Sequence, residues 1–182
     1  MAEIIIETER LILRTIAPGD IAHWAQHMNT PAVTEHLGGP REFVKIEANF
    51  AQTEAAFARD GFGFMMLQHK RSGDFIGNCG LKRVDNEYAP NVLLGEIEIG
   101  WSLREDYWRC GYAYEAAMAT FELAFERHGV PRVYAFTTER NEPSWRLMEK
   151  LAMTRQHDLD FDDPDYVAQD NPTIVYVKGE FG

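Results

Sequence analysis

The sequence contains little cysteine and no long apolar run. Its 182 residues include only two cysteines, Cys79 and Cys110, too few for a disulfide framework or a cysteine-rich zinc site. No stretch approaches the roughly 20 apolar residues of a membrane-spanning helix. The N-terminus also lacks the basic and apolar pattern of a signal peptide. We therefore expect a cytoplasmic protein without a membrane partner.

Basic residues are in the minority. The chain has 18 Lys and Arg against 29 Asp and Glu, which gives a formal net charge of −11. Binding to nucleic acid requires a field of the opposite sign, so we expect no nucleic-acid partner. A cationic substrate suits this charge. The six histidines show no His-x-x-x-His spacing accompanied by a carboxylate, and we expect no metal.

Segments with strand and helix periodicity alternate along the chain, and 45% of the residues are hydrophobic. In the first segment Leu11 and Leu13 lie on one face of the expected strand. The expected strands are 7–15, 62–69, 75–84, 92–103, 132–138, 154–159 and 173–178. The expected helices are 18–28, 42–59, 111–127 and 142–151. This order predicts one mixed α/β domain over residues 1–182.

The segment from Trp108 to Ala116 joins an expected strand to an expected helix, with Gly111 at the pivot of the turn. A helix that begins directly after such a turn leaves several backbone N–H groups without partners, and its dipole is positive at this end. The turn is therefore a candidate phosphate site. A single-glycine turn is a weak motif, however, and an ordinary strand–helix connection has the same pattern.

Three landmarks carry a family resemblance. The first is Trp108-x-x-Gly111-x-Ala113-x-Glu115-Ala116, the second is Asn141-Glu142-Pro143-Ser144, and the third is the opening Thr8-Glu9-Arg10-Leu11-Ile12-Leu13-Arg14. Together they resemble the GNAT N-acetyltransferases, in particular the branch of ribosomal-protein N-terminal (RimJ/RimL-type) enzymes. The resemblance implies a three-layer α/β/α sandwich of the α/β (α+β) class. Its sheet would be mixed, mostly antiparallel and splayed between the fourth and fifth strands.

The resemblance also implies a cofactor site for acetyl-CoA. The pyrophosphate would lie on the turn residues Arg109, Cys110, Gly111, Tyr112, Ala113 and Tyr114. The pantetheine arm would pair with the end of the fourth strand, at Trp101, Ser102 and Leu103. Asn141 would face this arm, and the Ser144 hydroxyl would donate a hydrogen bond to the leaving thiolate. Many family members use a tyrosine as that acid, at the position held here by Met148.

An amine must lose a proton before it can be acetylated, so a base is needed near neutral pH. Glu96 and Glu98 lie two positions apart on the expected fourth strand, and this spacing predicts one shared face. Either carboxylate is a candidate base, directly or through water. The same spacing also fits a solvated strand face. Asn141 likewise has a structural interpretation, as the N-cap of the helix that contains Ser144.

Two further groups are candidates for the acceptor side. An acidic run comprises Asp158, Asp160, Asp162, Asp163 and Asp165. Such a run is either a solvated loop or a surface that attracts a basic acceptor. The early helical segments, which shape the acceptor pocket in the family, contribute His23, Trp24, His27 and His36.

Three functions remain distinct at this point. The resemblance implies an N-acetyltransferase that acetylates a protein N-terminus or a small amine by direct attack in a ternary complex, and by family habit a homodimer. Met148 keeps open a second function, an acyl-CoA-binding module without turnover. A dinucleotide oxidoreductase is disfavoured because the chain has no Gly-x-Gly-x-x-Gly.

Overall fold

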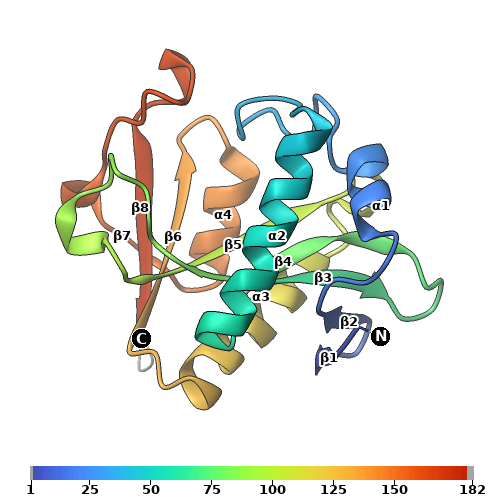
Figure 1. Ribbon diagram of the computed structural model, residues 1–182. Helices are drawn as coiled ribbons and strands as arrows, with labels where there is room; N and C mark the ends of the chain where they lie inside the picture. Colours follow the sequence, from blue (N-terminus) through green and yellow to red (C-terminus); the bar gives the residue numbers. More distant parts are fainter. Residues whose placement is uncertain (1, 180–182) are drawn as a thin grey trace.

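The computed structural model describes residues 2–179, in which a central sheet lies between two layers of helices (Figure 1). The described strands form one eight-stranded sheet in the order β1-β2-β3-β4-β5-β6-β8-β7. Neighbouring strands are antiparallel, except for β5 and β6, which are parallel. The predicted three-layer, mostly antiparallel architecture is confirmed. The predicted domain ends, residues 1 and 180–182, lie outside the described residues.

The strands are β1 (Ile4–Glu7), β2 (Leu11–Arg14), β3 (Phe64–His69), β4 (Phe75–Arg83), β5 (Ile97–Leu103), β6 (Arg132–Thr138), β7 (Thr154–Arg155) and β8 (Thr173–Gly179). The helices are α1 (Asp20–His27), α2 (Phe43–Asp60), α3 (Tyr112–Glu122) and α4 (Glu142–Lys150). Short 3-10 turns occupy Asn91–Leu93, Glu105–Tyr107, His157–Leu159 and Ala168–Asp170. A π-helical turn, Leu123–Arg127, continues α3.

Two apolar layers hold the helices on the sheet. On the face covered by α3 and α4, the buried Ala116 and Ala117 of α3 belong to the same core cluster as Leu13 and Ile99 of the sheet. Small side chains at these positions let the helix backbone approach the strands closely. On the other face, residues of α2 pack against β3 and β4. The buried cluster there consists of Met28, Ile46, Phe50, Met66 and Phe75. Figure 1 shows α2 crossing one face of the sheet with α3 behind it.

The prediction of one continuous strand over 7–15 is wrong, because the chain turns back at residues 8–10 to form the β1–β2 hairpin. Thr8 causes this turn. Its N–H donates to the Leu11 carbonyl at 3.0 Å, and its hydroxyl accepts the Leu11 N–H at 3.0 Å. Side-chain bonds of this kind compete with an extended strand. Leu11 and Leu13, which were predicted to share one face, are both buried in the core.

Two other strand boundaries also differ from the prediction. The strand expected over 92–103 begins only at Ile97, because the chain forms a 3-10 turn at Asn91–Leu93 and Gly95 has a φ of 81°. The apolar side chains Val92 and Leu94 are exposed there rather than in a sheet. The strand expected over 154–159 ends at Arg155, and a 3-10 turn follows.

Candidate active site

The sheet splits between β5 and β6. These two strands pair only at Ile97 with Val133 and at Glu98 with Tyr134. Beyond this point the rest of β5 stays paired with β4, while β6 stays paired with β8. The splay predicted between the fourth and fifth expected strands, which are β5 and β6 in the structure, is therefore confirmed. The β5 edge that faces the split, from Ile99 to Leu103, has no strand partner within residues 2–179. Apart from the Leu103 carbonyl, which accepts the indole N–H of Trp108, its backbone groups are available to an extended ligand, because an unpaired strand edge offers hydrogen-bond donors and acceptors.

A cavity of about 680 Å³ opens at the split. It lies within the size range of small-molecule sites, about 300 to 1,000 Å³. Helix α2 contributes one wall with Phe50 and Thr53. The site residues that line the cavity come from β5 and from the start of α4, namely Glu98, Gly100, Trp101, Ser102, Asn141 and Ser144. Residues predicted from separate landmarks thus share one cavity.

Glu98 lies in this cavity beside Lys82. The two residues are cross-strand partners on β5 and β4, and Lys82 Nζ lies 3.5 Å from Glu98 Oε2. The Glu98 side chain is only 15% exposed. Burial raises the pKa of Glu98, and the Lys82 ammonium opposes this rise without cancelling it. The charge of Glu98 in turn raises the pKa of Lys82. A carboxylate with a raised pKa is a better proton acceptor than an ordinary one.

Glu96 does not share this cavity, so the prediction that both carboxylates face one cleft is wrong. Glu96 precedes the first residue of β5 and pairs with Arg132, whose Nε lies 3.3 Å from Glu96 Oε2. It lines a smaller pocket of about 400 Å³ together with His128. The two-residue spacing predicts a shared face only within a strand. Here the strand starts one residue too late for that.

Asn141 and Ser144 face the cavity from the start of α4. Asn141 occupies the N-cap position, but its side chain makes no capping hydrogen bond. Its backbone carbonyl accepts the N–H groups of Ser144 and Trp145 at 3.0 and 3.3 Å, and its own N–H donates to the Thr138 carbonyl at 3.0 Å. The predicted N-cap position of Asn141 is confirmed, but its side chain does not serve as the cap. Its amide remains available to a ligand, with Met148 buried nearby in the cavity wall.

The turn after β5 presents backbone N–H groups in one region. Arg109 and Gly111 both have a left-handed backbone, with φ of 58° and 82°, and α3 begins directly after Gly111. In the part of the chain that the structure describes, the first N–H of this helix to donate a hydrogen bond is that of Glu115, which donates to the Gly111 carbonyl at 3.1 Å. The preceding N–H groups of the predicted set Arg109, Cys110, Gly111, Tyr112, Ala113 and Tyr114 are free to bind an anion.

The turn is fixed to the end of β5. The indole Nε1 of Trp108 donates to the Leu103 carbonyl at 2.7 Å, while the Trp108 side chain remains 45% exposed. Leu103 itself is buried and does not line the cavity, unlike Trp101 and Ser102. The predicted pantetheine edge and the predicted phosphate turn are thus joined by a direct side-chain contact.

Two of the five aspartates of the acidic run make structural contacts, and the other three, Asp158, Asp162 and Asp165, are exposed. Asp160 receives both terminal nitrogens of Arg155, at 2.6 and 2.5 Å. Asp163 is buried and accepts the side-chain amide of Asn86 at 2.7 Å. None of the five aspartates lines the cavity. Their placement does not support the interpretation that this run attracts a basic acceptor into the site.

Other polar residues of the cavity were not found from the sequence. Asp170 is buried and holds His36 Nδ1 at 3.3 Å and Arg140 Nη1 at 3.1 Å. No local sequence pattern identified Lys82 or Asp170 as site residues, because their partners are distant in sequence and meet them only in the folded chain. Of the four early candidates, Trp24 and His36 line the cavity, whereas His23 and His27 do not.

A split sheet beside a turn with free N–H groups defines a class of site suited to a ligand that combines an extended arm with a pyrophosphate. The comparisons with known proteins agree. The chain matches the acetyltransferase (GNAT) domain over residues 10–154. It is 27% identical over 152 residues to the uncharacterized N-acetyltransferase p20 of Bacillus licheniformis. The aligned region covers 82% of each chain.

Solved structures show the same fold. An acetyltransferase from Agrobacterium tumefaciens strain C58 is 28% identical, with a TM-score of 0.77 over 96% of this chain and 94% of that one. A ribosomal L7/L12 alpha-N-protein acetyltransferase, RimL, in complex with coenzyme A has a TM-score of 0.76 at 14% identity, over 97% and 98% of the two chains. The chain belongs to the GNAT acetyltransferase family. It is an acyltransferase that takes acetyl-CoA as its donor.

Among the described residues, no helix has both the length and the apolar character needed to cross a membrane.

Proposed function

We propose that this protein transfers the acetyl group of acetyl-CoA to a primary amine, either a protein N-terminus or a small amine, by direct attack in a ternary complex. The observation that carries this proposal is that Glu98, the free edge of β5 and the start of α4 all line the one cavity at the sheet split. A peptide N-terminus is supported by the RimJ/RimL-type landmarks and by the shared fold of RimL.

The residues take complementary roles in binding. The β5 edge at Trp101 and Ser102 receives the pantetheine arm, and Asn141 contacts the arm from the opposite side of the split. Leu103 is not assigned a contact, because it does not line the cavity and its carbonyl accepts the Trp108 indole N–H. The turn from Arg109 to Tyr114 receives the pyrophosphate, because its N–H groups and the positive end of α3 favour an anion. A main-chain N–H of β5 polarises the thioester carbonyl, as an oxyanion donor does.

Glu98 and Ser144 handle the protons. Glu98 takes the proton of the acceptor ammonium, directly or through water, which leaves the amine nitrogen free to attack the carbonyl carbon. The new C–N bond forms as the C–S bond breaks, and the Ser144 hydroxyl donates a hydrogen bond to the departing thiolate. The acetylated nitrogen then loses its second proton, which the thiolate takes up to leave as the CoA thiol. Ser144 takes this role because Met148, at the position of the usual tyrosine, has no proton to give. Glu96 is not assigned a role, given its contact with Arg132.

Calorimetry with acetyl-CoA, with NAD as the control, tests the cofactor site. A thiol-release assay against a panel of peptides and small amines then tests turnover. We expect Glu98→Gln to lower kcat/KM by about 10²- to 10⁴-fold, the usual contribution of a general base. The matched variant Glu96→Gln retains activity. Retention of full activity by both Glu98→Gln and Ser144→Ala would refute the roles assigned here, and absence of any turnover would favour an acyl-CoA-binding module.

A further inference from the structure

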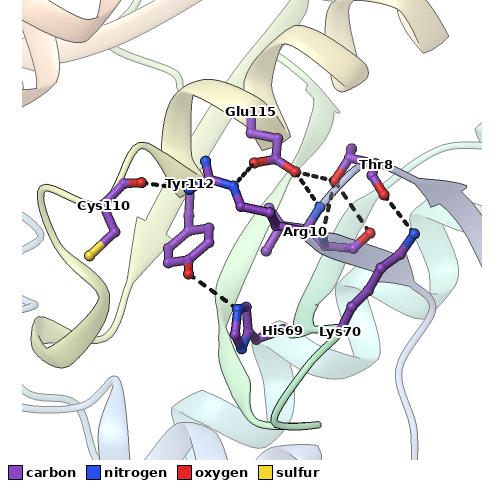
Figure 2. Close-up of polar contacts among 8 residues, drawn as sticks. Thr8, Arg10, His69, Lys70, Cys110, Tyr112 and Glu115 are labelled. Atoms are coloured by element: carbon purple, nitrogen blue, oxygen red, sulfur yellow. Dashed lines mark hydrogen bonds and ion pairs between the residues drawn. The ribbon is translucent and has the colours of Figure 1, made fainter.

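The N-terminal hairpin binds the first turn of α3, so two of the sequence landmarks are in contact (Figure 2). One oxygen of Glu115, Oε1, accepts the Thr8 hydroxyl at 2.5 Å and the Arg10 N–H at 2.8 Å. The other oxygen, Oε2, accepts Arg10 Nε at 2.6 Å. The Glu115 side chain is 15% exposed. This partly buried carboxylate is satisfied entirely from the hairpin.

Arg10 also contacts the candidate phosphate-binding turn itself. Its Nη1 donates to the Cys110 carbonyl at 2.9 Å, and its guanidinium carbon lies 4.5 Å from the centre of the Tyr112 ring. Its Nη2 lies 3.4 Å from the position that a Cβ on Gly111 would take. One side chain thus contacts the turn at Cys110 and Tyr112, on either side of Gly111, and the helix at Glu115.

The surroundings hold Arg10 and the turn in place. Lys70 Nζ donates to the Thr8 carbonyl at 2.6 Å and pairs with Glu7 at 3.0 Å, which fixes the hairpin against the end of β3. On the other side, the Tyr112 hydroxyl lies 3.2 Å from His69 Nε2. Figure 2 shows Tyr112 between Arg10 and His69. The turn is therefore supported on both sides by groups that do not line the cavity.

Glu115 poses an electrostatic problem at this position. A carboxylate in the first turn of a helix stabilises the helix, but it repels a phosphate that binds the same N-terminus. Burial favours its neutral form, yet the hydrogen bonds from Thr8 and Arg10 outweigh burial and hold the pKa of Glu115 below its usual range. Glu115 is therefore charged at neutral pH, and Arg10 is the cation that compensates it.

We propose that Arg10 is a positioning residue for acetyl-CoA. It holds the Cys110–Tyr112 backbone so that its N–H groups face the pyrophosphate, and it neutralises Glu115 beneath them. Thr8 and Glu115 hold Arg10 in this position through their hydrogen bonds. This inference rests on the proposed function, since it takes the turn as the pyrophosphate site. It also gives two of the family landmarks, Thr8-Glu9-Arg10 and the Glu115 motif, one shared physical purpose.

Arg10→Ala tests the proposal, with Arg71→Ala as the matched control, because Arg71 is exposed in the β3–β4 turn and contacts neither Glu115 nor Cys110. Calorimetry should show the Kd for acetyl-CoA rising by roughly tenfold in Arg10→Ala, the loss of a charge-assisted contact at a helix terminus. Arg71→Ala should match the wild type. At saturating acetyl-CoA, kcat and the acceptor KM should stay unchanged in both variants.

A second pair of variants separates charge from geometry. The double variant Arg10→Ala/Glu115→Gln should bind acetyl-CoA more tightly than Arg10→Ala, because the uncompensated carboxylate is gone. The Kd ratio of Arg10→Ala to wild type should also shrink between about 0.1 M and about 1 M salt, as the Debye length falls from about 10 Å to about 3 Å. Arg10→Lys keeps the charge but loses the contact with both Glu115 and Cys110. Its Kd for acetyl-CoA should lie between those of the wild type and Arg10→Ala.

Thermal unfolding establishes that each variant is folded before its Kd is interpreted. If Arg10→Ala does not fold, Arg10→Lys and Thr8→Val carry the test, and both should bind acetyl-CoA more weakly than the wild type. Folded variants that bind acetyl-CoA as the wild type does would overturn the positioning role and leave the proposed function intact. A folded wild type that fails to bind acetyl-CoA would overturn both.

Discussion

Glu98 and Lys82 form a charged pair within the cavity, and each alters the proton affinity of the other. Burial raises the pKa of Glu98, and the Lys82 ammonium opposes that rise. Glu98 accepts a proton only when it is ionised, so the activity of the enzyme should increase as the pH passes upward through this pKa. The position of the acidic limb of the pH profile is therefore a direct readout of the contact.

Lys82→Met should move the acidic limb of kcat/KM to higher pH. The substitution removes the positive charge that favours ionised Glu98. Burial and the negative charge of Asp85 remain, and both raise the pKa of Glu98. A pH profile of kcat/KM measures this shift, since it reports groups of the free enzyme. Lys45→Met is the control, because Lys45 is exposed on α2 and does not line the cavity. A limb that stays in place or moves to lower pH contradicts the assignment of Glu98.

Local spacing was enough to nominate several site residues. Gly111 was identified by its place between a strand and a helix, and Glu98 by its place on the strand before it. In the structure Glu98 lies on β5 and Gly111 directly precedes α3, as their sequence neighbours indicate. Glu96 shows the limit of this reasoning, because the alternation that pairs it with Glu98 holds only if the strand includes both residues. The strand begins at Ile97 instead.

At the scale of elements, the turn before α3 depends on its backbone conformation. Gly111 has a φ of 82°, and Gly129, before β6, has a φ of 61°. A side chain at either position is strained by about 1 to 2 kcal/mol, because Cβ crowds the backbone in the left-handed region. Substitution of either glycine by alanine should therefore destabilise the fold by a similar amount, although only Gly111 lies at the candidate phosphate site.

We expect Gly111→Ala and Gly129→Ala each to lower Tm by a few degrees, roughly 2 to 4 °C for each kcal/mol in a chain of this size. Only Gly111→Ala should weaken acetyl-CoA binding, because its Cβ would meet Arg10 beside the candidate phosphate site. Differential scanning fluorimetry and calorimetric titration measure the two effects. Equal losses of acetyl-CoA affinity in both variants would mean that the effect comes from general destabilisation.

Element types were predicted more accurately than element boundaries. Long amphipathic segments such as α2 were recognised because their periodicity extends over several turns. The hairpin at residues 8–10 was missed because Thr8 bends the chain through its own side-chain bonds to Leu11. The exposed apolar residues Val92 and Leu94 resembled a strand, since hydrophobicity alone does not reveal whether a partner strand is present.

For the whole molecule, the split of the sheet is the main consequence of the fold. Residues Ile97 and Glu98 pair directly with β6, and beyond them the two halves of the sheet diverge. A ligand seated in the split would contact β5 and α4 together, and so would link the halves. Binding to the native state alone stabilises a protein by about 2.7 kcal/mol at 100 times Kd.

Acetyl-CoA at about 100 times its Kd should therefore raise Tm by about 5 to 10 °C. In hydrogen exchange, the added protection should fall on the backbone amides of residues 99–103 and 109–114. The amides of β7, at Thr154 and Arg155, line neither the cavity nor the turn, so they should change little and serve as the internal reference. Protection centred on the small pocket around Glu96 and His128 would contradict the assigned site.

Properties that depend on a few neighbouring residues were determined by the sequence alone. These are the helix that begins after Gly111, the alternation of Leu11 and Leu13, and the position of Ser144 at the start of a helix. Each follows from backbone geometry over one or two turns or a short strand. The family landmarks added their order along the chain, which pointed to the sandwich fold.

The tertiary structure alone decided which of these residues meet. It put Lys82 against Glu98, turned the Asn141 side chain away from its helix cap, and brought Arg10 to Glu115 across 105 positions of sequence. No local pattern encodes such contacts, because they depend on strand order and register. Those in turn are set by burial of the apolar faces on both sides of the sheet, a property of the whole chain.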